Sequence, residues 1–504
     1  MTADTTMEIT LPVGRVRGVR RHGWSEFRGI PYAAPPVGTR RFRSPQPHGA
    51  WSDVLDATRF GPVCPQEFDA IDAAMGADDQ PQSEAGCLTL SVWRPEQAAS
   101  GSGLPVMVWI HGGALSSGAS SWPQYDGRAF ARDGIVFVGV NYRLHALGFL
   151  DFGRFGADDG RPTTNLGLQD AELALRWVRA NIAAFGGDPE NITIFGESAG
   201  GAMVNGLVAS PTARGLFRRA VMQSGTCVRL IEHEAAGQIT RNACRLLGVA
   251  PDDRAALQAV PVRELVGLVG IPGLLEGVDT PVTFPWLFTR DPAGLDLDGL
   301  EAVDAGRADG LELILGWTAD EYRLRRLTRA PDGLPEDLSP LGDLTGALLA
   351  AHARHRPELD PVELSEAVLN HQHFYAPALR IADAHARRGG SVHLYEFRWR
   401  SPVLGGRLGS CHALEIPFVF DRAVAPAFHG PLPLPARLVE VMHGSWAAFA
   451  RDGNPSVPGL VWPAHRPGSR FTAVFDTDSR VVEDLHPDLA ALWERARPEQ
   501  IGIQ

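Results

Sequence analysis

The chain has 504 residues, of which 44% are hydrophobic, and 47 basic against 59 acidic side chains give it a formal net charge of −12. It can bury a large core, and the absence of a basic run argues against nucleic acid or an anionic membrane as its main partner. No apolar stretch approaches the roughly 18 residues that span a bilayer, and residues 1–10 lack the pattern of a signal peptide, so we expect a cytoplasmic protein. The five cysteines are too few for a disulfide framework.

Strand-like and helix-like runs alternate along the chain without an internal repeat. We predict strands at 105–110, 135–142, 311–315 and 392–397, and helices at 171–185 and 436–450. This alternation predicts an α/β fold with a large, mostly parallel sheet and helices on both of its faces. We expect residues 1–504 to form a single domain, in which the irregular segment 267–304 forms a cap or a pocket wall.

Ser198 occupies the centre of the most informative motif. The run Gly196-Glu197-Ser198-Ala199-Gly200 has the pattern G-x-S-x-G, with a β-favouring run before it and a helix-compatible run, 202–208, after it. In that context the pattern predicts a nucleophile elbow, a tight turn that exposes the serine hydroxyl. An ordinary glycine turn is the alternative in a chain with 55 glycines, and the strand and helix around the motif favour the nucleophile.

An earlier glycine turn is suited to stabilising negative charge. The predicted strand 105–110 runs into His111-Gly112-Gly113-Ala114. Backbone N–H groups that no side chain covers can point at a developing alkoxide. With the N–H of Ala199, this turn would form an oxyanion hole. The alternative is again a simple glycine turn, and the order of the two motifs along the chain argues against it.

A serine nucleophile needs a base and an acid that orients the base, and both often follow it along the chain. Asp320 and Glu321 follow the predicted strand 311–315, and the pattern does not choose between them or against a solvated acidic turn. For the base we favour His412, which lies in a small glycine-containing loop. Other histidines fall in charged or helical stretches: His352, His355, His371 and His373.

Further segments extend these motifs over nearly the whole length. They are residues 27–33, 35–38, 106–113, 141–144, 185–189 and 195–201. Together they resemble the type-B carboxylesterase family, which includes cholinesterases and bacterial para-nitrobenzyl-type esterases. The resemblance implies an α/β-hydrolase fold and the hydrolysis of small-molecule carboxylic esters without a metal or an organic cofactor.

The resemblance also implies roles for single residues. It makes Glu321, rather than Asp320, the acid and His412 the base. Ala114 stands where many members have glycine, a change that keeps the backbone N–H. The implied oxyanion donors are Gly113, Ala114 and Ala199, and Ser224 matches a serine that supports the acid.

Some positions depart from the family pattern. His145 replaces a usual glycine, and the sequence assigns no effect to that change. Cys64 and Cys87 match the family's disulfide pair, a bridge that a reducing cytoplasm would leave open. The segment between them has no tryptophan, the residue with which cholinesterases hold choline, so we expect no cholinesterase specificity.

The resulting hypothesis is a serine carboxylesterase for short-chain or aromatic esters. Cleavage of amides, carbamates or aromatic polyesters by the same route is the alternative. A binding protein without activity is disfavoured because Ser198, Glu321 and His412 are all present. The sequence does not choose between a monomer and a small homo-oligomer. Four residues could line the substrate pocket or simply pack in the core: Phe284, Pro285, Trp286 and Phe288.

Overall fold

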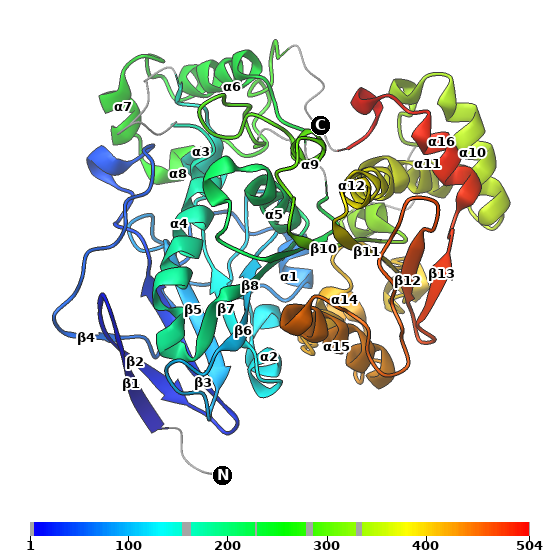
Figure 1. Cartoon of the computed structure of the whole chain (residues 1–504). Helices are drawn as coiled ribbons and strands as arrows, with labels where there is room; N and C mark the ends of the chain where they lie inside the picture. The colour runs from blue at the N-terminus through cyan, green and yellow to red at the C-terminus, as the bar shows by residue number, and fades with distance from the viewer. Residues whose placement is uncertain (1–4, 154–162, 227–228, 279–285, 329–334, 503–504) are drawn as a thin grey trace.

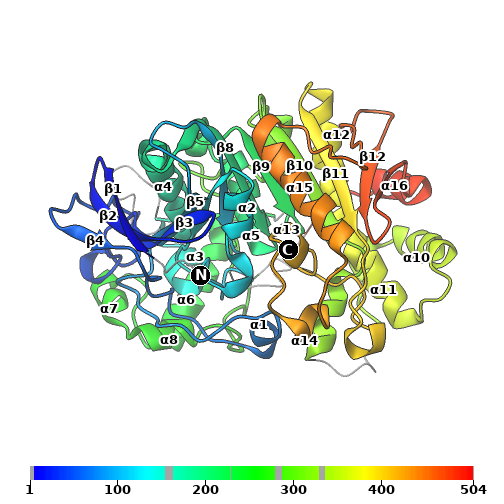
Figure 2. The same cartoon turned by 90° about the horizontal axis from the view of Figure 1, so that it is seen from below.

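A computed structural model describes residues 5–153, 163–226, 229–278, 286–328 and 335–502. Within these ranges, thirteen strands form one sheet (Figures 1 and 2). In spatial order they are β1 (Thr5–Leu11), β2 (Gly14–Arg20), β3 (Trp24–Pro31), β5 (Thr89–Pro95), β7 (Val136–Val140), β6 (Leu104–Ile110), β8 (Gly187–Glu197), β9 (Arg219–Gln223), β10 (Glu312–Thr318), β11 (Ser391–Phe397), β12 (Phe471–Phe475) and β13 (Arg480–Glu483), with β4 (Val54–Asp56) beside β2.

The strands from β7 to β12 are all parallel to their neighbours. The first part of the sheet and its last strand, β13, pair antiparallel. The prediction of a mostly parallel sheet is therefore confirmed, with an antiparallel amino-terminal region that it did not include. Parallel strands need crossover connections, which explains why helices cover both faces.

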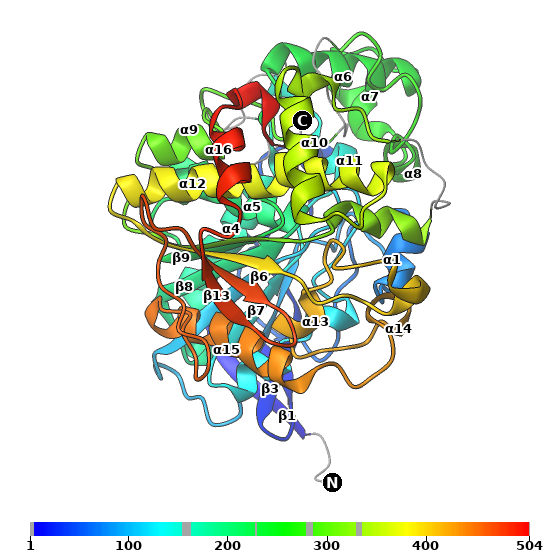
Figure 3. The same ribbon diagram turned by 90° about the vertical axis from the view of Figure 1, so that its right-hand side faces the viewer.

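Alternate residues of β6 enter two different cores. Val106, Val108 and Ile110 belong to one hydrophobic cluster, whereas Met107 and Trp109 belong to the other. This is the period of two that a strand buried on both faces imposes. Helices α5 (Ala199–Ala209) and α12 (Ala376–Arg387) cover one face, and α15 (Ala436–Asp452) covers the other (Figure 3).

The predicted helix 171–185 starts too late. Helix α4 spans Leu166–Asn181, and a 3-10 turn, Ile182–Phe185, continues it. The polar residue Asp170 made the apolar pattern begin after it, although Asp170 is fully buried. Its carboxylate accepts two hydrogen bonds of 2.8 Å from the Arg143 guanidinium. A paired buried charge of this kind interrupts the apolar pattern without interrupting the helix.

Strand β10 is longer than the predicted 311–315. It continues through Gly316 and Trp317 to Thr318, in register with β11. Gly316 has no room for a side chain, since a Cβ there would lie 2.0 Å from the Tyr395 ring. The extra residues carry the chain directly to Asp320 and Glu321.

The segment 267–304 is partly described. It contains helix α9 (Gly299–Asp304) and otherwise irregular chain. Trp286 and Phe288 are 1% and 2% exposed and pack in the hydrophobic core, while Phe284 and Pro285 lie outside the described residues. In the described ranges, no helix has both the length and the apolar character needed to cross a membrane.

Candidate active site

Ser198 sits in the turn between β8 and α5, in a conformation that side chains rarely adopt (φ 56°, ψ −125°). Two glycines allow this turn to close against the neighbouring strand. A Cβ on Gly200 would lie 2.1 Å from the Ile110 carbonyl oxygen, and one on Gly196 would lie 2.5 Å from the Gly200 carbonyl group. The Ser198 N–H donates to the Gln223 carbonyl at 2.9 Å. The result is a strained, rigid serine at the end of a central strand.

The glycine turn after β6 lies directly against this serine. A Cβ on Gly112 would be 3.2 Å from the Ser198 Cβ and 2.7 Å from the Glu197 carbonyl oxygen, so only glycine permits the approach. Gly113 and Ala114 follow with positive φ values of 108° and 53°. No described residue accepts a hydrogen bond from the N–H of Gly113, Ala114 or Ala199. These three donors are therefore available to an oxyanion.

His412 is held by Glu321. Its Nδ1 lies 2.5 Å from Glu321 Oε2. The other oxygen of Glu321 accepts from the Ser224 hydroxyl at 2.8 Å and from the Thr318 N–H at 2.7 Å. Both oxygens of Glu321 are thus bound, which fixes the carboxylate. Because His412 contacts it through Nδ1, the other imidazole nitrogen, Nε2, faces the serine turn. That Nε2 lies 3.2 Å from Oε1 of Glu197, the residue before Ser198.

Asp320, the alternative acid, points elsewhere. Its carboxylate accepts from Arg356 Nη1 at 2.8 Å and from the Ser410 N–H at 3.1 Å. The geometry thus separates two adjacent carboxylates that spacing alone left equivalent. Glu321 contacts His412, and Asp320 joins the two loops that carry Glu321 and His412.

The imidazole of His412 is surrounded by three buried carboxylates. Glu321 is one, and Glu197 and Glu415 are the others, which the sequence analysis did not single out. Both were close to recognised residues, Glu197 inside the serine motif and Glu415 three positions after His412. Burial of His412 favours the neutral ring, but the charges of Glu197 and Glu321 outweigh it and raise the pKa of His412 above its ordinary value.

We expect Glu197→Gln to extend activity to lower pH. Burial raises the pKa of Glu197 itself, and where Glu197 is ionised its charge favours the imidazolium of His412. Removal of this carboxyl therefore lowers the pKa of His412 and leaves more of the ring neutral. The acidic limb of the profile of kcat/KM against pH should therefore move to lower pH. Glu415→Gln is the comparison, since Gln223 donates to that carboxylate at 3.1 Å. An acidic limb that stays in place in Glu197→Gln would contradict an electrostatic role of Glu197.

The other candidate histidines have their contacts elsewhere. His373 Nδ1 contacts the Tyr322 hydroxyl, and His352, His355 and His371 line a separate pocket. His145, the departure from the family glycine, is fully buried with a φ of 39°. Its Nε2 lies 2.7 Å from the Pro65 carbonyl oxygen, and its backbone N–H donates to the Leu115 carbonyl, next to the glycine turn.

Burial lowers the pKa of His145 to about 4, so its ring is neutral. The neutral ring is held by the Pro65 carbonyl, and the backbone N–H of His145 holds the chain just after the glycine turn through Leu115. Cys64 and Cys87, which the resemblance pairs in a disulfide, are buried free thiols in the structure.

Comparison with known proteins gives consistent matches over the whole chain. The sequence model described as "Carboxylesterase family" matches residues 5–324 and 349–487. The para-nitrobenzyl esterase of Bacillus subtilis (strain 168) is 35% identical over 485 residues, 94% of this chain and 96% of that protein. A phenmedipham hydrolase of Pseudarthrobacter oxydans is 34% identical, over 98% and 99% of the two chains. A crystal structure of a Geobacillus stearothermophilus carboxylesterase superposes with a TM-score of 0.81 at 36% identity, covering 96% and 99%.

Proposed function

The chain belongs to the carboxylesterase family and is a carboxylic ester hydrolase, and from that premise we propose that Ser198, Glu321 and His412 are its catalytic triad. The observation that carries this assignment is the contact of His412 Nδ1 with Glu321, which leaves Nε2 toward the serine elbow. Such a pair orients the base and stabilises its charged form. We further propose Gly113, Ala114 and Ala199 as the oxyanion donors.

The reaction proceeds through an acyl-enzyme. Ser198 Oγ attacks the ester carbonyl carbon while His412 Nε2 takes the hydroxyl proton. The carbonyl oxygen becomes an oxyanion that the three N–H groups bind, and each strong donor contributes roughly 3–4 kcal/mol in comparable sites. When the intermediate collapses, His412 gives its proton to the departing alkoxide. The products of this half are the alcohol and an ester of Ser198.

Water completes the cycle by the same route. His412 takes a proton from water, which attacks the acyl carbon, and the second intermediate releases Ser198 as its proton returns from His412. The carboxylic acid then leaves. Glu321 keeps its position throughout, because its two oxygens are bound by the Ser224 hydroxyl, the Thr318 N–H and the imidazole. No step in this route calls for a metal or an organic cofactor, or for any partner besides the small ester and water.

We propose short-chain and aromatic esters as the substrates. The para-nitrobenzyl esterase among the relatives supports aromatic alcohol groups as the first to try. The test is a series of p-nitrophenyl acetate, butyrate and octanoate with para-nitrobenzyl acetate, and a matched anilide and carbamate. We expect saturable turnover of the esters, with kcat/KM for butyrate at least about a hundredfold above that for the anilide, since an amine leaves less readily than a phenolate.

Absence of turnover with every ester, in protein that unfolds cooperatively, would refute the proposed triad function. An anilide or carbamate hydrolysed faster than the esters would leave the triad in place and overturn the proposed substrate class.

A further inference from the structure

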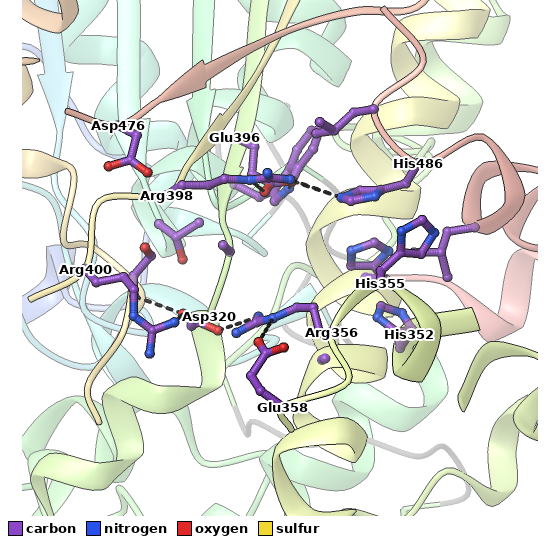
Figure 4. Close-up of a pocket in the computed structure, with 18 residues that line it drawn as sticks. Asp320, His352, His355, Arg356, Glu358, Glu396, Arg398, Arg400, Asp476 and His486 are labelled. Carbon is purple, nitrogen blue, oxygen red and sulfur yellow. Dashed lines mark hydrogen bonds and ion pairs between the residues drawn. The ribbon is translucent and has the colours of Figure 1, made fainter. Parts of the chain in front are cut away.

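A pocket of about 490 Å³ lies beside Asp320, the residue before Glu321 (Figure 4). It is bounded by the ends of β10 and β11, by α10 (Leu344–His355), by the π-helical turn His371–Tyr375 and by the chain leading into α16 (Pro487–Glu494). Ser198, Glu321 and His412 do not line it, whereas Asp320 and Ser410 do. The pocket thus touches the loops that carry Glu321 and His412.

Three arginines border this pocket. Figure 4 shows Arg398 with His486 along one side, and Arg356 and Arg400 on either side of Asp320 along the other. Arg356 uses Nη1 for Asp320, and Arg398 uses Nη2 for His486, at 3.2 Å. The Nη2 of Arg356 and the Nη1 of Arg398 have no hydrogen-bond partner among the described residues. Arg400 is half exposed, with its nearest carboxylate, Asp320, at 3.9 Å.

Buried imidazoles form the end of the pocket. His352 is 3% exposed, and its Nε2 has no partner in the described part of the chain. The same holds for Nδ1 of His371, whose ring centroid is 4.4 Å from that of His352, and for Nδ1 of His486. Burial and the neighbouring cationic groups lower the pKa of His352 to about 3, so the ring is neutral and carries one N–H. Nε2 of His486 accepts from Arg398, so a neutral His486 carries its proton on the unpartnered Nδ1. An unpaired buried donor costs about 1–3 kcal/mol, which an accepting ligand would recover.

The other lining residues indicate the polarity and charge of a ligand that would fit the pocket. Trp317, Leu485 and Leu489 contribute apolar surface. Four carboxylates also line the pocket. Asp320 and Glu396 are buried and each is bound by an arginine, and Glu358 accepts from Nε of Arg356 at 3.3 Å. Asp476 lies at the pocket's edge, and these contacts leave Nη2 of Arg356 and Nη1 of Arg398 free for a ligand. Arginine edges match a carboxylate in shape and charge, and neutral imidazole N–H groups add donors. These features together fit a carboxylate attached to an apolar group.

We propose that this pocket binds a monocarboxylate with an aromatic or aliphatic body, the class of acid that ester hydrolysis releases. This inference rests on the proposed function in one respect only, namely that ester hydrolysis produces the acid. Asp320 and Ser410 exchange two hydrogen bonds, of 3.0 and 3.1 Å, immediately before Glu321 and two residues before His412. A carboxylate bound to the free Nη2 of Arg356 shares that guanidinium with Asp320, which is bound at Nη1, and weakens the contact between Arg356 and Asp320. The acid therefore slows turnover without competing with the ester.

The test is calorimetric titration of the whole protein with sodium benzoate at constant ionic strength. Arg400→Met removes a half-exposed guanidinium, and Arg398→Lys keeps the charge beside Glu396 but removes the planar edge. We expect either change to weaken benzoate binding about tenfold. Arg245→Met in α6 (His233–Leu246), where the arginine is 55% exposed, is the matched control and should bind as the wild type does. Benzyl alcohol lacks the charge and inorganic phosphate lacks the apolar body, so both should bind more weakly than benzoate.

Kinetics supplies the second readout. Without benzoate, both pocket variants should hydrolyse p-nitrophenyl butyrate at the wild-type rate, and benzoate should lower kcat in the wild type far more than in the variants. Equal benzoate affinity in the wild type and both variants, no binding up to about 20 mM, or inhibition that only raises KM would overturn the proposal. Turnover of p-nitrophenyl butyrate is measured separately from benzoate binding. An active esterase that does not bind benzoate would refute the pocket alone, whereas absence of turnover would refute the esterase function.

Discussion

Alanine at position 198 should lower kcat for p-nitrophenyl butyrate by about a millionfold, to the level that binding and the oxyanion donors alone sustain. The hydroxyl is the nucleophile in the proposed route, and no other described hydroxyl or thiol stands at the elbow. Because the three residues act as a unit, removal of a second one costs little more. Initial rates of Ser198→Ala and of Ser198→Ala with His412→Ala should therefore agree within about tenfold.

The fold should survive this change. The Ser198 side chain makes no hydrogen bond to another described residue, and alanine fits where serine fits. Thermal unfolding of the variant should stay within a few degrees of the wild type. Organophosphate labelling, judged by intact mass, should add one group to the wild type and none to the variant. A stable variant that keeps more than about 1% of the activity would refute Ser198 as the nucleophile.

Glu321→Gln should lower kcat by about ten thousandfold, although glutamine has nearly the same shape. Oε1 of Glu321 accepts from two donors, the Ser224 hydroxyl and the Thr318 N–H, so the amide oxygen must take that place. The amide NH2 then faces His412 Nδ1 and donates to it. An imidazole that accepts at Nδ1 carries its proton on Nε2, where it cannot take the proton of Ser198.

Asp320→Asn is the matched control, an adjacent carboxylate changed in the same way. It weakens the contact with Arg356 and should lower thermal stability, while kcat should fall less than about tenfold because the Glu321 contact with His412 is intact. Measuring kcat and the unfolding temperature of both variants separates a catalytic effect from a structural one. Equal loss of kcat in the two would contradict the assignment of Glu321 as the orienting acid.

Local patterns predicted much of the fold. The apolar runs at 105–110 and 392–397 became β6 and β11, and the helix predicted at 436–450 became α15 with its start correct. These elements pack on both sides of the sheet or show a clear helical period, so local composition reflects their burial. Errors arose where tertiary contacts override composition, as at Asp170, whose charge is neutralised by Arg143 from a distant turn.

The candidate site was only partly visible in the sequence. The serine and glycine turns have local signatures because their backbones need particular residues. The choice of Glu321 over Asp320 depends on which way two adjacent side chains point, and the resemblance supplied it where spacing could not. Glu197 and Glu415 were overlooked because nothing local marks a carboxylate as buried beside a histidine. The arginine-lined pocket assembles residues from seven separate segments between Trp317 and Leu489, so no single stretch could have suggested it.

The order of strands has a consequence for how the enzyme is made. From β9 to β13, each strand lies beside the one synthesised just before it. A growing polypeptide leaving the ribosome can therefore add each new strand to an edge that already exists, with no insertion between finished neighbours. Of the proposed triad, Ser198 follows β8, Glu321 follows β10 and His412 follows β11. The proposed triad is therefore incomplete until about four fifths of the chain has been synthesised. Catalytic activity then requires that the strands up to β11 are already in place.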